Sequence, residues 1–194
     1  FSAGFDNNQP NLTYNSYQRF TLNASNTYTL FRDRLQVTAG IQYTQSNTYN
    51  NNPGFSNFVP ELRLVDENGN PLSVGAKLRQ GYTDTAGQGK LLDWNYRPLE
   101  EARLSDNVIK LINYSVNLGI KYRILSGFDF NLLYQYNNGN SSQQNYHSQS
   151  TFYTRDLINR YTNINFSSGA ITYGIPVGGI VDFNNQSYFS HQLR

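Results

Sequence analysis

The strongest constraint on the fold of this chain is a strict alternation of apolar and polar residues along residues 112–136, INYSVNLGIKYRILSGFDFNLLYQY. The first half places six apolar or aromatic residues two positions apart: Ile112, Tyr114, Val116, Leu118, Ile120 and Tyr122. After a break at residues 124–127, the period resumes through Phe128, Phe130, Leu132, Tyr134 and Tyr136. A period of two is typical of strands with one apolar and one polar face. The stretch therefore predicts a β-hairpin whose apolar face needs a partner.

Two more segments alternate in the same way. Residues 17–31 place an apolar set on one face, with Asn26 as the exception: Phe20, Leu22, Ala24, Tyr28 and Leu30. Residues 35–44 repeat the pattern with Leu35, Val37, Ala39, Ile41 and Tyr43. Residues 1–6 and 188–194 read as shorter strands, and Pro98 begins a short predicted helix. The pattern predicts an all-β chain with about six antiparallel strands.

The connections between the predicted strands differ in length in a regular way. Residues 32–34 and 124–127 form short turns, whereas residues 45–110 and 137–187 form long irregular stretches. The short turns lie at one end of the strands and the long loops at the other. Outer-membrane barrels have this arrangement, with short periplasmic turns and long extracellular loops. The lengths favour a segment of a large antiparallel transmembrane β-barrel with long extracellular loops.

The composition of the two faces agrees with this interpretation. No Lys, Arg, Asp or Glu falls on the apolar register of the four full strands, and an unpaired charge there would cost about 2–4 kcal/mol at mid-depth in a bilayer. Only 14% of all residues are charged, compared with about 25% in an average soluble protein. Asn, Gln, Ser and Thr supply the polarity and suit a barrel interior. We therefore expect the apolar faces to contact outer-membrane lipid.

Composition and motifs argue against several other classes of protein. The net charge is only +2 without a basic run, so nucleic acid is not an expected partner. The absence of Cys excludes a disulfide scaffold and a Cys-based zinc site. No apolar run is long enough for a transmembrane helix. His147 and His191 lack a third ligand, and no nucleophile motif or acid/base pair appears. We expect no enzyme activity, no metal and no cofactor.

Two loop motifs approach known ligand sites without matching them. Residues 66–72 are rich in oxygen donors, but Pro71 fills the position where a calcium loop requires Gly, and Lys77 replaces the final Glu. We interpret this stretch as a turn. Residues 84–91 lack the first Gly of a phosphate loop, because Asp84 stands there, and Leu91 replaces the Ser or Thr.

The alternation leaves alternatives open. The apolar faces could meet in the dry core of an antiparallel sandwich, which would make the chain a soluble carbohydrate-binding module. A porin-like barrel without energy coupling would differ only in the sequence upstream of Phe1. Both ends of the chain read as interrupted strands. We therefore expect residues 1–194 to be part of one barrel domain, with the plug domain and the remaining strands outside this chain.

Several unusual stretches, in order along the chain, resemble the SusC/RagA-type TonB-dependent transporters. These stretches are DENGNPL at residues 66–72, LDWNYRPL at 92–99, SQSTFYTRDLINRYT at 148–162 and YGIPVGGIVD at 173–182. The resemblance implies a large plugged barrel in the bacterial outer membrane that imports oligosaccharides or peptides. It also implies two partners: a SusD-like surface lipoprotein, and TonB acting through an N-terminal region that this chain lacks.

The aromatic and basic residues of the long loops are the candidate contacts with cargo or with the lipoprotein. They are Trp94, Tyr96 and Arg97 in the first loop, and Tyr146, His147, Phe152 and Tyr153 in the second. Aromatic rings can stack on sugar faces, and Arg can pair with carboxylates or backbone carbonyls. The competing interpretation is that these side chains pack the loops together.

Overall fold

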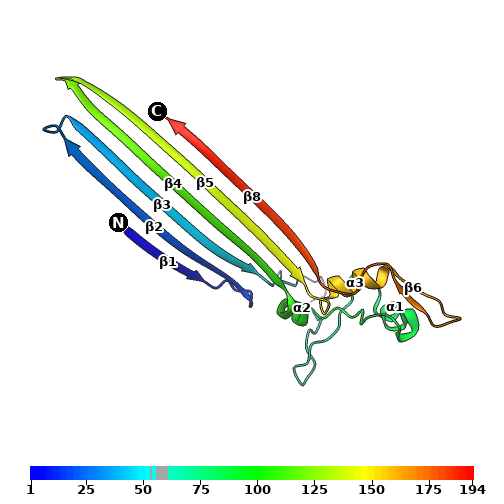
Figure 1. The fold of residues 1–194 in the computed structure, drawn as a ribbon. Coiled ribbons are helices and arrows are strands. Elements are labelled where there is room, and N and C mark those ends of the chain that lie inside the picture. The colour runs from blue at the N-terminus through cyan, green and yellow to red at the C-terminus, as the bar shows by residue number, and fades with distance from the viewer. Residues whose placement is uncertain (53, 56–60) are drawn as a thin grey trace.

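The computed structural model describes residues 1–52, 54–55 and 61–194. In this part of the chain, six strands form one antiparallel sheet (Figure 1): β1 (Ser2–Asn8), β2 (Asn15–Leu30), β3 (Leu35–Asn50), β4 (Asp106–Leu125), β5 (Phe128–His147) and β8 (Ile180–Leu193). They pair in the order β1-β2-β3-β4-β5-β8. The structure is mostly antiparallel sheet, which confirms the predicted all-β class at this level.

The remaining elements lie in the two long connections. They are α1 (Gln80–Thr85), η1 (Ala86–Gly89) and α2 (Pro98–Leu104) before β4, and α3 (Phe152–Arg160), β6 (Thr162–Ile164) and β7 (Ile171–Tyr173) before β8. All of them lie beyond one end of the sheet, whereas the β2–β3 and β4–β5 turns lie at the other end (Figure 1). Helix α2 confirms the helix predicted at Pro98. We call these two ends the loop end and the turn end.

The predicted strand boundaries near the loop end are wrong. Strand β3 continues to Asn50, β5 continues to His147, and β8 already begins at Ile180. The irregular stretches are therefore shorter than residues 45–110 and 137–187. Near these ends both faces carry Asn, Gln and Ser, so the apolar alternation stops while the backbone pairing continues. Tyr146 and His147 accordingly end a strand instead of lying in a loop.

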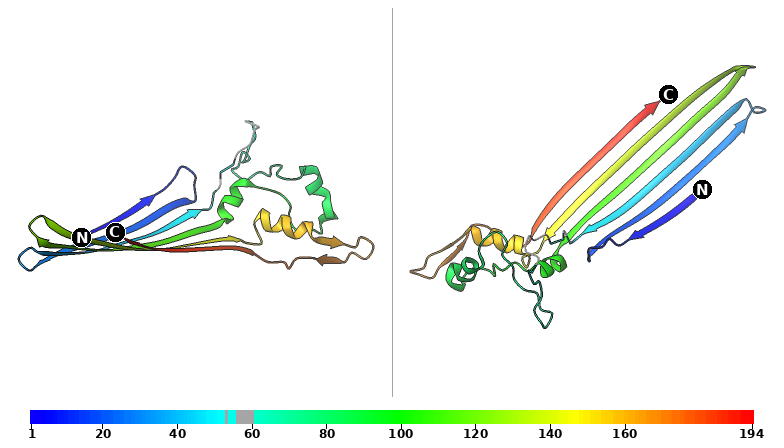
Figure 2. Two further views of the ribbon diagram at one scale, coloured as in Figure 1. Left: turned by 90° about the horizontal axis from the view of Figure 1, so that it is seen from above. Right: turned by 180° about the vertical axis from the view of Figure 1, so that it is seen from behind.

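The sheet is a single layer, and the buried apolar side chains lie elsewhere. The side chains of Val74, Trp94, Ala102 and Ile158 are buried, and all four come from the loop-end connections. In contrast, apolar residues in the middle of the sheet remain exposed, as Leu118 does at 44%. Figure 2 shows that the helices gather at the loop end and leave the strands uncovered. Among the described residues, no helix is long and apolar enough to span a membrane.

One glycine on the polar face makes room for an aromatic ring of the neighbouring strand. Gly139 of β5 pairs with Tyr188 of β8, and a Cβ at Gly139 would overlap the Tyr188 ring and Asn113 Oδ1. The Tyr188 hydroxyl donates a hydrogen bond to that Oδ1 at 3.3 Å. The ring therefore crosses β5 and connects β8 to β4.

We predict that Gly139→Ala weakens the attachment of β8. The new methyl group displaces the Tyr188 ring, and overpacking of this kind costs about 1–3 kcal/mol. Hydrogen exchange of the β8 amides should therefore become faster than in the unchanged chain. Gly4→Ala is the matched control, because a Cβ at Gly4 in β1 meets no atom within 4 Å. Equal exchange rates in the two variants would contradict the prediction.

Candidate functional site

The apolar face of the sheet carries two rows of aromatic rings. Three strands have one ring in each row, eight positions apart: Phe20 and Tyr28 on β2, Tyr114 and Tyr122 on β4, and Tyr136 and Phe128 on β5. Eight residues of extended strand span about 26 Å. Between the rows, this face of β2 to β5 has no Lys, Arg, Asp or Glu. The rows therefore enclose an apolar band without charges.

The row nearer the loop end has one aromatic ring on each of the strands β2, β3, β4, β5 and β8. Ring centroids lie 6.4 Å apart for Phe20 and Tyr43, 5.9 Å for Tyr114 and Tyr136, and 4.9 Å for Tyr136 and His191. Tyr43 and Tyr114 face each other directly in the strand register. Each ring thus has an aromatic neighbour on the adjacent strand.

This row does not run perpendicular to the strands. Phe20 pairs with Gln45 in the register, so the row moves two residues toward the turn end to reach Tyr43. It moves two more between β4 and β5, because Tyr114 pairs with Asn138 and not with Tyr136. Phe5 of β1 pairs with Phe20 and extends the row to β1. From β1 to β8 the row thus shifts by four residues over five strand steps. At about 3.3 Å per residue and 4.8 Å per strand, it makes an angle of about 30° with the direction perpendicular to the strands.

A second cluster forms at the loop end around helix α3. The Asp156 side chain is 2% exposed and accepts hydrogen bonds from Trp94 Nε1 at 3.0 Å and Lys77 Nζ at 3.0 Å. The Asn159 amide donates to the Leu92 carbonyl at 2.9 Å and accepts from the Leu92 N–H at 2.9 Å. One face of α3 thus holds the preceding connection through polar contacts between distant residues.

Helix α3 also joins α2 through charged groups. Arg155 contacts Asp93 Oδ2 at 3.0 Å and Glu101 Oε1 at 3.5 Å. The same Glu101 oxygen accepts the backbone N–H of Phe152, at the first turn of α3, at 2.7 Å. Thr151 precedes this turn as the N-cap and accepts the N–H of Thr154. The two connections therefore form one packed unit, which we call the loop cluster.

The environment moves the pKa of two carboxyl groups in the loop cluster in opposite directions. Burial raises the pKa of Glu101 and outweighs its hydrogen bonds from Phe152 and Arg155. Burial also acts to raise the pKa of Asp93, but hydrogen bonds from Arg97 and the Asn95 N–H, with the charges of Arg97 and Arg155, lower it overall. Asp93 thus stabilises the folded cluster above the ordinary Asp pKa of about 3.9, and this contribution is lost on further acidification.

Most of the predicted contact residues in the first loop pack within the cluster. Trp94 is 8% exposed and donates its indole N–H to Asp156. The rings of Tyr96 and Phe152 lie 5.1 Å apart and join the two connections. Arg97 pairs with Asp93 at 2.8 Å. These contacts favour the interpretation that the side chains pack the loops together.

Two of the predicted contact residues near α3, Tyr146 and Tyr153, are more exposed. His147 stacks on Tyr153 with ring centroids 4.3 Å apart, and its Nε2 lies 3.3 Å from Asp182 Oδ2. Tyr153 is 43% exposed and Tyr146 is 38% exposed. A Cβ at Gly179 would approach the Tyr146 ring to 2.7 Å, so Tyr146 covers this glycine. The structure brings His147 and Tyr153 together and places Tyr146 beside β8.

The structure also shows an open groove that the sequence analysis did not predict. It lies between α1 and β6, and its exposed rings come from Tyr82, Tyr161 and Phe166. Arg160 and Asn163 contribute polar groups to its lining. These residues come from stretches without a repeating pattern, so only the folded loop cluster brings them together. The groove presents rings and hydrogen-bonding groups on one surface.

Comparison with known proteins does not assign the chain to a family. No family model matches it, and no curated protein matches it. Within the described ranges, no group of three His, Cys, Asp or Glu side chains is placed to hold a metal ion.

Proposed function

We propose that this chain forms part of the barrel wall of a SusC-like TonB-dependent transporter in the bacterial outer membrane. The barrel would import oligosaccharides or peptides together with a SusD-like lipoprotein and would draw energy through TonB. The resemblance of residues 66–72, 92–99, 148–162 and 173–182 to that family supports the particular transporter class. The physical support for the membrane location comes from the sheet itself.

The eight-residue separation of the two aromatic rows is the observation that carries this proposal. Outer-membrane barrels have an apolar band about 25 Å tall between two aromatic girdles. Eight residues span about 26 Å along a strand, and a tilt of about 30–40° reduces this to roughly 20–23 Å. The band also lacks charged residues on this face of the four longest paired strands, β2 to β5. Its height and composition suit a hydrocarbon layer.

The strand tilt and the free edges agree with the proposed barrel. The drift of the row nearer the loop end corresponds to about 30°, near the 35–45° tilt of closed barrels. Within the part of the chain that the structure describes, strands β1 and β8 each have one edge without a partner strand. Apolar rings on them are widely exposed, with Phe5 at 67% and Phe189 at 71%. Further strands of the same barrel would cover these edges.

Single-cysteine labelling tests the membrane location, because the chain has no Cys of its own. Val116→Cys and Leu132→Cys probe the apolar face, and the adjacent Ser115→Cys and Asn131→Cys are matched controls on the polar face. We expect a lipid-soluble reagent to label the first pair, which a membrane-impermeant reagent leaves unmodified. Equal reaction of both faces with the water-soluble reagent would overturn the proposal.

The groove beside Tyr82 and Tyr161 favours a second candidate, a soluble carbohydrate-binding module. Exposed rings with neighbouring hydrogen-bonding groups suit the faces and hydroxyls of sugars. This function would require the apolar face to be covered by protein, yet the six long strands form a single layer. A soluble protein whose Val116→Cys variant resists both reagents would favour this candidate.

A further inference from the structure

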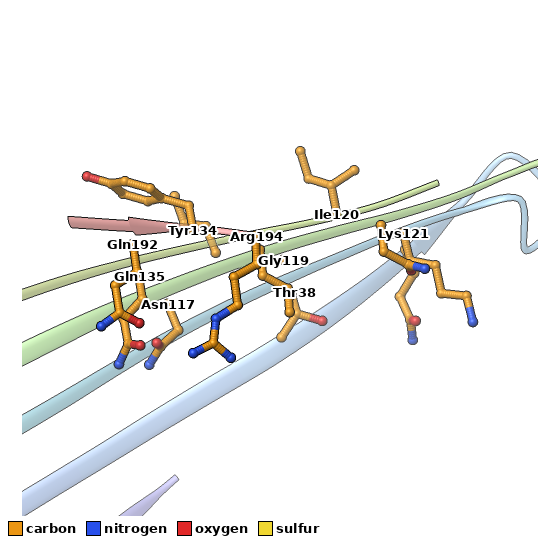
Figure 3. Close-up of a pocket in the computed structure, with 13 residues that line it drawn as sticks. Thr38, Asn117, Gly119, Ile120, Lys121, Tyr134, Gln135, Gln192 and Arg194 are labelled. Atoms are coloured by element: carbon orange, nitrogen blue, oxygen red, sulfur yellow. The ribbon is translucent and has the colours of Figure 1, made fainter. Parts of the chain in front are cut away.

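The sheet face that carries the aromatic rows continues beyond the row nearer the loop end. Figure 3 shows the two faces of the sheet, with Tyr134 pointing to one side and Gln135 to the other. Because side chains alternate along a strand, the face of Tyr134 continues at every second position of residues 138–146. Strand pairing adds every second position of residues 45–49 and 106–112 to the same face. We call this surface the outer polar band.

Amide and hydroxyl groups dominate the outer polar band. Of its twelve residues, eight carry an amide or a hydroxyl group and two are charged. The amides begin directly at the aromatic row. The Tyr43 hydroxyl donates to Gln45 Oε1 at 2.9 Å, and the Asn138 amide donates to the Tyr136 hydroxyl at 3.3 Å. The hydroxyl ends of these rings therefore face the band and mark its lower boundary.

A hollow of about 230 Å³ lies within the outer polar band, across β3, β4 and β5. Tyr49, Lys110, Ser142 and Gln144 are among the residues that line it, together with Asp106. Lys110 and Asp106 are four positions apart, about 13 Å along the strand, which is too far for a direct ion pair. The hollow thus offers donors and acceptors to a partner that is rich in hydroxyl groups.

Exposed rings accompany these polar groups on the same face. Phe183 of β8 pairs with Gln144 and is 60% exposed, and Tyr146 is 38% exposed. Aromatic rings can stack on the apolar faces of sugars, whose hydroxyls bind amides. A phenyl ring gains nothing from contact with bulk water. The combination of rings and amides therefore favours a saccharide as the partner of this surface.

The height of the outer polar band favours a lipid with a large headgroup. Asp106 lies eight positions beyond Tyr114, about 26 Å along the strand, and a tilt of about 30–40° reduces this to roughly 20–23 Å. The headgroup layer of an ordinary bilayer is only about 5–8 Å thick on each side. A phospholipid headgroup therefore covers the positions next to the aromatic row, whereas a chain of sugars can also cover the rest.

We propose that the sugar headgroup of an outer-leaflet glycolipid docks on the outer polar band. Its acyl chains would cover the apolar band beneath, so one molecule satisfies two surfaces that are continuous on the same strands. Lys110 would donate to sugar hydroxyls or to a phosphate group on them, and Asp106 would accept from hydroxyls. The inference rests on the proposed function, because only a membrane-embedded barrel with its loop end outside the cell presents this band to the outer leaflet.

Photo-crosslinking of the intact transporter, reconstituted in lipid vesicles, tests this inference. One sample contains phosphatidylethanolamine alone, and the other also contains lipopolysaccharide as the glycolipid probe. A photoreactive amino acid at position 142 should form a lipopolysaccharide adduct, detected as a sugar-staining band of higher mass. The same group at position 141 is the matched control, because Ser141 and Ser142 are adjacent serines on opposite faces, and should form none. Position 132, in the apolar band, should form lipid adducts in both samples.

Two double variants measure the contribution of the amides. Asn140→Leu with Gln144→Leu removes one Asn and one Gln from the outer polar band and should lower the adduct yield at position 142 about tenfold. Gln143→Leu with Asn145→Leu removes the same pair of residue types from the opposite face of β5. This second variant should preserve the yield.

The possible outcomes separate this inference from the proposed function. Lipid adducts at position 132 without a lipopolysaccharide adduct at position 142 would overturn the glycolipid site and leave the membrane location standing. Phospholipid or protein adducts alone at position 142, or a yield that is unchanged by the Asn140→Leu and Gln144→Leu pair, would also overturn it. The absence of lipid adducts at position 132 would contradict the membrane location itself.

Discussion

Replacing Asp156 with alanine should unfold the loop cluster while the long strands stay paired. The carboxylate is almost fully buried and joins Trp94 Nε1, Lys77 and Arg160, the last at 3.5 Å. Its removal leaves the buried indole N–H without an acceptor and two cations without their shared partner. An unsatisfied buried donor costs about 1–3 kcal/mol, and the loss of two ion pairs whose cations are about half exposed adds at most about 1 kcal/mol each. A small cluster with few buried apolar side chains cannot absorb such a loss.

Hydrogen exchange resolved by segment provides the measurement. We expect the amides of α2 and α3 to lose protection, whereas those in the middle of β4 and β5 keep it. Asp156→Asn should be milder, because its amide oxygen still accepts the Trp94 N–H. Asp84→Ala is the matched control in the same cluster, since this exposed carboxylate accepts, among the described residues, a hydrogen bond from the Gln80 amide alone. If the control loses as much protection as Asp156→Ala, the buried network does not hold the cluster together.

The sheet was largely predictable from the sequence, because each strand can be recognised from its own residues. Alternation at period two appears within each strand, and an apolar register such as Val116 to Tyr122 needs no knowledge of distant residues. The short turns follow from the breaks between registers. The strand ends near the loop end were not predicted, because the local alternation stops before the strands do. Around Asn140, both faces are polar, so backbone pairing alone defines the strand.

The loop cluster was not predictable from local pattern. Helix α3 buries four polar residues and a single apolar one: Thr154, Arg155, Asp156, Asn159 and Ile158. Its sequence therefore has no amphipathic period of the usual kind. The partners of these groups lie about sixty residues away, as Trp94 and Leu92 do. A sequence cannot indicate which distant carboxylate will neutralise Arg155. Trp94 was therefore predicted as a contact residue, although its ring packs inside the cluster.

The aromatic rows were predictable only in part, in contrast to the sheet and to the loop cluster. Each ring could be assigned to a strand end from the sequence, because Tyr122 and Tyr136 occupy the apolar register. The continuity of the row depends on register between strands, which places Tyr43 opposite Tyr114 and Tyr136 opposite His191. His191 joins the row only through that pairing. Strand pairing thus aligns aromatic residues from separate strands into rows with a defined separation and tilt.

A lysine at the centre of this band should prevent stable membrane assembly. Leu118 lies four positions from Tyr114 and four from Tyr122, at mid-height on the apolar face. In hydrocarbon, Leu118→Lys costs about 2–4 kcal/mol at mid-depth, and the penalty falls to about 0–1 kcal/mol near the interfaces. The amount of folded protein in the outer-membrane fraction and the urea midpoint in lipid vesicles should both fall.

Two further lysine variants test whether the cost of the charge depends on its depth in the membrane. Asn117→Lys puts the same charge on the polar face one residue away, and Gln45→Lys puts it on the apolar face beyond the row nearer the loop end. Both should assemble nearly as well as the unchanged chain. In the dry core of a soluble protein, the free-energy cost of a buried charge depends on the local packing. That cost would show no relation to the distance of the lysine from the aromatic rows. Only a hydrocarbon layer between the rows makes Leu118→Lys severe while Gln45→Lys, on the same face, is tolerated.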